Sequence, residues 1–99
     1  MFDKLINFFS DESKWMKGHY YGNEKKEVCP EREATRYCLL GAIAILYDNN
    51  DESDRVCNSL RGVIRARGYN MISTFNDSEK TSFDDILSVI KECEESYES

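Results

Sequence analysis

The chain has 99 residues, of which 19 are acidic and 13 basic, and its net charge is -6 with a pI of about 4.8. This length is enough for one domain and too short for two, so we predict a single domain over residues 1–99 with an acidic C-terminal tail at about 92–99. The negative charge repels phosphate backbones and attracts basic surfaces. The composition therefore disfavours direct binding to nucleic acid and favours a protein partner with a basic surface.

The first residues do not resemble a leader peptide, because an acid stands at Asp3 and the apolar run is short, with no basic region before it. No run approaches the roughly 20 apolar residues that cross a bilayer. We expect a cytoplasmic protein that does not engage a membrane. The sequence does not indicate an oligomeric state.

Three elements are predicted in the first half of the chain. Apolar residues at Phe2, Leu5, Ile6 and Phe9 have the spacing of a helix face and predict a short helix over residues 2–9. Residues 13–28 mix aromatic residues, glycines and charges without a period, which predicts a structured loop. Pro30 suits a first helical turn and good helix formers follow it, so a helix is predicted over residues 30–47. Its uncharged part, residues 37–47, is expected to be a buried central helix in which Gly41 lets a neighbouring backbone approach closely.

The second half predicts two further helices. Asp51 is a favourable N-cap for an amphipathic helix over residues 51–67, which Gly68 ends. The strand formers of residues 69–75 predict a short extended segment, followed by a polar turn over residues 76–80.

A last helix is capped by Thr81 or Ser82, with Asp84 or Asp85 at its third position, and the tail from Glu92 is expected to fray. The predicted fold is all-α or mostly α. It is a compact bundle of about four helices around the buried helix 37–47, with a short extended segment near 69–75.

The cysteines, Cys29, Cys38, Cys57 and Cys93, form no C-x-x-C pair, so we predict reduced thiols and no metal or cofactor. Cys38, His19 and either Asn76 or Asp77 are the residue types of a cysteine nucleophile with its base and orienting group. However, burial inside an uncharged helix would raise the pKa of Cys38. No catalytic residue is predicted, and a binding protein is favoured over an enzyme.

Three groups of side chains are candidates for binding. Trp15, His19, Tyr20 and Tyr21 form an aromatic group that either anchors a partner or covers the core, and the exposure of the rings separates these readings. Asp51, Glu52 and Asp54 form an acidic group suited to a basic partner. Arg61 and Arg65 lie four residues apart on one helix face, where they either grip an anion or are solvated and paired with acids. Arg67 on the same helix, and Arg32 and Arg36 on the preceding one, could join this group.

A resemblance rests on residues that occur together here: Trp15 followed by Gly18, the segment CLLGAI at 38–43, and FND at 75–77 with Thr81 opening the last helix. Over residues 15–93 the chain resembles a family of small uncharacterised domains of phage and bacterial genomes, which share a W-G loop, a C-L-x-G-A helix and a W/F-N-D turn. Phe75 stands where many relatives have tryptophan. The resemblance implies the shared pattern and no activity.

Asn76 and Asp77 can bond backbone amides and hold the turn before the last helix. If this turn met the loop of Trp15, the two would form a polar and aromatic pocket. We therefore predict a small acidic protein-interaction domain. By analogy of class, it is a phage-encoded inhibitor of a CRISPR-type defence complex that occupies a basic surface in the host cytoplasm. The alternative is a small-molecule or nucleotide-binding protein, or a small hydrolase, with a pocket of Trp15, His19, Asn76 and Asp77.

Overall fold

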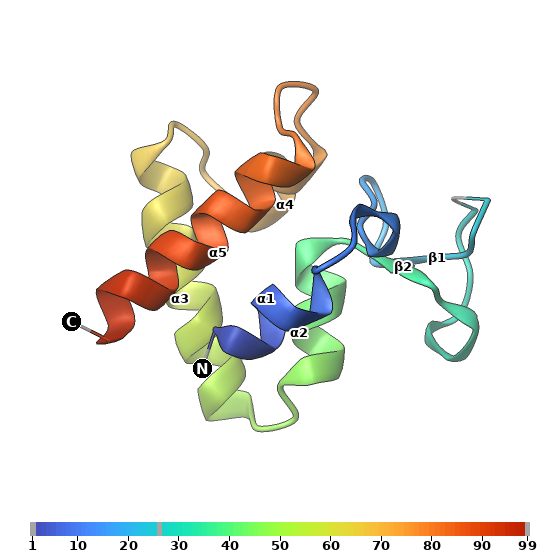
Figure 1. The fold of residues 1–99 in the computed structure, drawn as a ribbon, viewed down its shortest axis with the longest axis horizontal. Helices are drawn as coiled ribbons and strands as arrows, with labels where there is room; N and C mark the ends of the chain where they lie inside the picture. The colour runs from blue at the N-terminus through green and yellow to red at the C-terminus, as the bar shows by residue number, and fades with distance from the viewer. Residues whose placement is uncertain (1, 26, 99) are drawn as a thin grey trace.

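The computed structural model describes residues 2–25 and 27–98, and most of them are helical (Figure 1). The α-helices are α1 (Asp3–Phe8), α2 (Leu39–Leu46), α3 (Asn50–Ala66), α4 (Ile72–Asp77) and α5 (Phe83–Glu98). Two short 3-10 helices, η1 (Glu12–Lys14) and η2 (Glu31–Glu33), flank the strand β1 (Tyr21–Gly22), and β2 (Arg36–Tyr37) pairs with β1 in antiparallel register. The predicted mostly α fold is confirmed.

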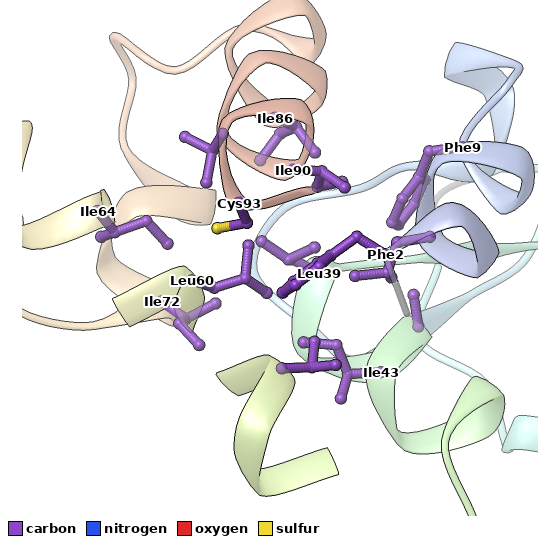
Figure 2. Packing of buried hydrophobic residues seen from close by; sticks show 14 of the residues in the cluster. Phe2, Phe9, Leu39, Ile43, Leu60, Ile64, Ile72, Ile86, Ile90 and Cys93 are labelled. Atoms are coloured by element: carbon purple, nitrogen blue, oxygen red, sulfur yellow. The ribbon is translucent and has the colours of Figure 1, made fainter. Parts of the chain in front are cut away.

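The core lies where α1, α2, α3 and α5 meet (Figure 2). It is one cluster of buried side chains that includes Phe2, Phe9, Leu39, Ile43, Leu60, Ile64, Ile86, Ile90 and Cys93. Removing each such aliphatic or aromatic side chain from water contributes about 1.5–3 kcal/mol. The apolar faces read from the sequence for α1, α3 and α5 are therefore the faces that hold the fold together.

The helix predicted over residues 30–47 is shorter than expected and begins only at Leu39. Pro30 precedes the 3-10 turn η2, and residues 36–37 are in β2, because their backbone pairs with β1 and with Trp15. Central burial is confirmed for Ala42 and Ile43, whereas Leu40 and Leu46 are only partly buried and Ala44 is exposed.

The boundaries of α3 and α4 also differ from the prediction. Asn49, not Asp51, is the N-cap of α3, and its Oδ1 accepts a hydrogen bond from the Asp51 N–H at 2.8 Å. Gly68 follows α3 with a φ of 97°, as expected of a residue that ends a helix. Met71 is extended, but α4 occupies residues 72–77, so the extended segment predicted over 69–75 is wrong for most of its length.

The predicted cap of α5 is confirmed at Ser82 and Asp85. The Ser82 N–H donates to Asp85 Oδ2 at 2.9 Å, and the Asp85 N–H donates to Ser82 Oγ at 3.2 Å, which is a capping box. The tail does not fray at Glu92, because α5 continues to Glu98; Ser99 lies outside the described residues.

The predicted loop over residues 13–28 carries η1 and β1 and, with η2 and β2, forms a lobe at one side of the helices (Figure 1). Isolated β-bridges pair the backbone of Trp15 with Tyr37 in β2 and that of Val28 with Gly22 in β1. Because β1 also pairs with β2, the backbone at Trp15, β2, β1 and the backbone at Val28 are four short segments joined side by side. In the part of the chain that the structure describes, no helix has both the length and the apolarity needed to cross a membrane.

Candidate functional site

Asn76, in the last turn of α4, is a buried side chain whose hydrogen-bonding groups are all used. Its Oδ1 accepts from the Trp15 Nε1–H at 2.7 Å and from the Leu39 N–H at 3.1 Å. Its Nδ2 donates to the Met16 carbonyl at 3.1 Å and to Asp77 Oδ1 at 2.9 Å. One side chain thus joins the loop after η1 to the beginning of α2 and the end of α4. We call these five residues the Asn76 junction.

The next residues extend this connection on both sides. Asp77 Oδ1 accepts a second hydrogen bond from the Gly18 N–H at 2.8 Å, and Lys17 Nζ donates to the Ser78 carbonyl at 2.7 Å. Gly18 has a φ of 88°, a conformation that favours glycine over other residues. Asn76 and Asp77 end α4 rather than forming part of the predicted turn over 76–80, but the loop of Trp15 does meet them. The tryptophan, glycine, asparagine and aspartate of the sequence pattern therefore form one structural connection.

Gly41 lies in the first turn of α2 against the Tyr20 carbonyl, and a β-carbon at this position would collide with that backbone. The Cys38 N–H donates to the same carbonyl at 3.3 Å. The expected close approach of a neighbouring backbone at Gly41 is therefore confirmed, and it holds the loop of His19 and Tyr20 against α2.

A small pocket of about 130 Å³ opens beside the Asn76 junction. It is lined by Gly18, His19, Tyr20, Cys38, Leu40, Ser73, Asn76 and Asp77. Sites for drug-sized ligands measure about 300 Å³ or more, so this pocket has room for only a few non-hydrogen atoms. The four hydrogen bonds of Asn76 leave it no group for a ligand, and the groups that remain come from His19, Tyr20, Ser73 and one oxygen of Asp77.

Cys38 is the N-cap of α2 rather than an interior residue of a helix, and its Sγ accepts from the Gly41 N–H at 3.3 Å. Burial raises the pKa of the Cys38 thiol, the N–H groups of Gly41 and Leu40 oppose this effect, and the Asp77 carboxylate adds to it. The thiol is therefore protonated at neutral pH and is a poor nucleophile, although His19, Cys38 and Asp77 line one pocket.

All four cysteines are free thiols, of which Cys38 and Cys93 are buried. Among residues 2–25 and 27–98, no group of three or more histidine, cysteine, aspartate or glutamate side chains is placed to hold a metal ion.

The aromatic group predicted as a partner anchor is divided by the structure. Trp15 is partly buried against Phe83, with ring centroids 6.0 Å apart, and its indole N–H is held by Asn76, so it covers the core. Tyr21 packs edge-on against Tyr37 at 5.7 Å. Tyr20 is 59% exposed and His19 is also exposed. A role in partner binding stays a prediction, and the exposed side chains available for it are His19 and Tyr20.

The acidic group lies in the first turns of α3, with Asp51 and Asp54 exposed. Glu52 forms a loose ion pair with Lys4 at 3.8 Å. This group lies near the turn between α2 and α3, at the end of the bundle opposite the connection between α4 and α5 (Figure 1).

The predicted anion-binding pair is engaged locally, because Arg61 Nη1 donates to Asn58 Oδ1 at 3.0 Å and Arg65 Nε to the Asn70 carbonyl at 3.5 Å. These two N–H groups of Arg61 and Arg65 therefore have partners within the chain and do not need a ligand to satisfy them. Anion binding at Arg61 and Arg65 stays a prediction.

One residue of functional interest was missed by the sequence reasoning. Ser73 lines the small pocket, and its position three residues before Asn76 on one helix face would have indicated this had α4 been recognised as a helix. Arg36 was expected on the helix 30–47 as a possible neighbour of Arg61 and Arg65, but it lies in β2 beside a second cavity.

No curated protein and no solved structure matches this chain. A family model does match it over residues 8–96, which is nearly the whole of the described chain. The range includes the Asn76 junction, the small pocket and all the candidate side chains named above. The chain belongs to DUF6197, a family of unknown function.

Proposed function

We propose that this domain is an acidic protein-interaction module that docks on a basic surface of a protein partner. The observation that carries the proposal is the acidic group at the beginning of α3. Asp51 and Asp54 are exposed there, and among the described residues neither forms an ion pair or a side-chain hydrogen bond. Since no cation in residues 2–25 and 27–98 uses these carboxylates, they remain available to an external one.

In its finer form the proposal is that the partner is a nucleic-acid-binding defence complex of a phage host, of the CRISPR type, met in the host cytoplasm. The net charge of -6 supports this form, because a groove that binds nucleic acid is basic and attracts an acidic occupant. The same charge opposes direct binding to nucleic acid. This form of the proposal rests on analogy with a class of small acidic proteins, and proteins of many other functions share the same size and charge.

The test is affinity capture from a bacterial lysate with the wild type and with two charge reversals matched in net charge. Asp51→Lys with Asp54→Lys changes the acidic group, and Glu31→Lys with Glu33→Lys changes exposed acids of η2. The first variant should lose the captured protein and the second should keep it, provided that thermal melts show both folded. Equal loss in both variants would mean nonspecific attraction, and equal retention would refute the acidic surface.

Salt gives a second readout. Raising it from about 50 to 500 mM shortens the Debye length from over 10 Å to a few ångströms and should slow association with the captured partner. Arg61→Ala and Arg65→Ala should leave that association unchanged. If the arginines were essential and salt had no effect, the anion-binding interpretation would replace this one.

The second candidate function is a small-molecule-binding protein or a small hydrolase. One observation favours it: five residues with polar groups, His19, Tyr20, Cys38, Ser73 and Asp77, line the pocket of about 130 Å³. Its volume suits a small polar molecule and is too small to enclose a nucleotide. A hydrolase that used Cys38 would need a thiolate, which burial disfavours.

Alkylation by iodoacetamide separates the two candidates. Cys29, which is partly exposed, should react before Cys38, and Cys38→Ser should keep partner capture intact. Faster labelling of Cys38, or loss of function in a folded Cys38→Ser variant, would establish an activated thiol in the pocket and favour the second candidate.

A further inference from the structure

Arg36, in β2, is a partly buried arginine that forms no close ion pair, although its charge helps to lower the pKa of the Asp11 carboxyl. Its Nε is covered by protein and has no hydrogen-bond partner. In the described part of the chain no ion pair or hydrogen bond involves its guanidinium, although acids outnumber bases 19 to 13. A partly desolvated cation with an unsatisfied donor is unfavourable, and an anion at its remaining N–H groups would stabilise it.

A cavity of about 530 Å³ lies beside this guanidinium, large enough for a small organic molecule. It is lined by Asp11, Glu12, Ser13, Trp15 and Arg36. These residues come from η1 with its flanking positions and from β2, which are brought together by the bridge between Trp15 and Tyr37. The cavity is separate from the pocket of Cys38, with which it shares no lining residue.

The walls of this cavity carry both charges and an apolar surface. The guanidinium of Arg36 matches a carboxylate, which it can grip with two N–H groups. Asp11 accepts from the Ser13 N–H at 2.9 Å, and this bond lowers the pKa of the Asp11 carboxyl, so Asp11 is an anion at neutral pH. Glu12 is exposed beside it. The ring of Trp15 is fixed by its bond to Asn76, packs on Phe83 and has Lys17 Nζ 5.5 Å from its centroid, and the part that lines the cavity offers a rigid apolar surface.

We propose that this cavity binds a small zwitterion, an α-amino acid with an apolar side chain, whose carboxylate pairs with Arg36, whose ammonium faces Asp11 and Glu12, and whose side chain contacts Trp15. A ligand with several negative charges, such as a nucleotide, is repelled by the two acids. A simple cation can pair with the two acids but leaves the Arg36 guanidinium without a carboxylate. A zwitterion satisfies both groups at once, and its apolar part uses the indole.

The first experiment is a titration of the whole chain with L-phenylalanine, followed by fluorescence. Because the chain has one tryptophan and this residue lines the cavity, its emission reports binding there. We expect a saturable change with a Kd of about millimolar or tighter. Two derivatives test the two charged groups separately. N-acetyl-L-phenylalanine lacks the ammonium group, and L-phenylalanine amide lacks the carboxylate. Each should bind at least about tenfold more weakly.

The variant Arg36→Gln should weaken L-phenylalanine binding at least about tenfold, whereas Arg32→Gln, which removes an exposed arginine of η2, should not. If Arg36→Gln fails to fold, the wild type still decides the question by NMR. L-phenylalanine should shift the single Trp15 indole signal and the Arg36 Nε–H signal together.

An unchanged wild-type spectrum, equal binding of either derivative, or undiminished binding by a folded Arg36→Gln variant would overturn the proposal. None of these outcomes depends on the acidic surface of α3.

Discussion

Replacing Asn76 by alanine tests whether the Asn76 junction is structural. The substitution removes four hydrogen bonds and leaves the Trp15 indole N–H, the Leu39 N–H and the Met16 carbonyl without that partner. A buried hydrogen bond contributes about 1 kcal/mol, and each orphaned group costs about 1–3 kcal/mol. Because water can enter the space and relieve part of this cost, we expect a loss of about 3–5 kcal/mol. This is a large fraction of the roughly 5–15 kcal/mol that stabilises a domain.

Urea denaturation followed by circular dichroism measures this loss. Asn58→Ala, which removes only a solvent-exposed hydrogen bond from Arg61 on α3, is the matched control and should change stability by less than about 0.5 kcal/mol. Trp15→Phe keeps one aromatic ring but removes the indole N–H and the five-membered ring, so it should cost about 1–3 kcal/mol and show coupling to Asn76→Ala in a double-mutant cycle. A loss below about 1 kcal/mol for Asn76→Ala, or no coupling, would refute the structural role.

Four further predictions concern the helices. Gly41→Ala should destabilise the domain by about 1–3 kcal/mol, because its β-carbon meets the Tyr20 carbonyl. Gly62→Ala should stabilise it by about 0.5–1 kcal/mol, because the space beside α3 is open there. If the two alanine variants changed the melting temperature by the same amount in the same direction, the predictions for Gly41 and Gly62 would be contradicted. Leu60→Ala should cost about 2–5 kcal/mol and Leu46→Ala, at a partly buried site, less than about 2 kcal/mol in denaturant titration. The Ser82 N–H holds the pKa of Asp85 below its usual value, so this cap stabilises α5 above about pH 4 and is lost as the pH falls through the folded-state pKa. Asp85→Asn should reduce that acid sensitivity, and an unchanged pH profile of the melting temperature would count against the cap.

The elements that could be predicted from the sequence are those whose local pattern and tertiary role agree. The amphipathic stripe of α3, the stop at Gly68 and the capping box of Ser82 and Asp85 are all properties of neighbouring residues. The segment before Cys38 has equally good helix formers, but its backbone is drawn into β2 by pairing with β1. The segment 69–75 has strand formers, but Ile72 and Phe75 bury themselves as one face of α4. In both cases long-range contacts override local propensity.

The candidate site shows the same division. The sequence indicated that Asn76 and Asp77 bond backbone N–H groups and that a pocket requires them to meet the loop of Trp15, but the turn predicted at these two residues is the last turn of α4. Their complete use in hydrogen bonds could not be anticipated, because it depends on the Leu39 N–H and the Met16 carbonyl, backbone groups that have no signature in the sequence. The unsatisfied Nε–H of Arg36 could not be anticipated for a related reason, since it depends on which groups the folded chain brings beside β2.

The Asn76 junction also bears on the order in which the chain folds. It joins residues 15 and 76, which are 61 positions apart, and its formation carries the entropy cost of closing a long loop. The pairing of α3 with α5 closes a shorter segment and buries much of the core, so we expect it to form earlier. The lobe of β1 and β2 then docks last and opens first in the native protein. Native-state hydrogen exchange should show the amides of residues 15–22 exchanging well before those in the middle of α3 and α5, and a protease should cut within this lobe while the helices remain folded.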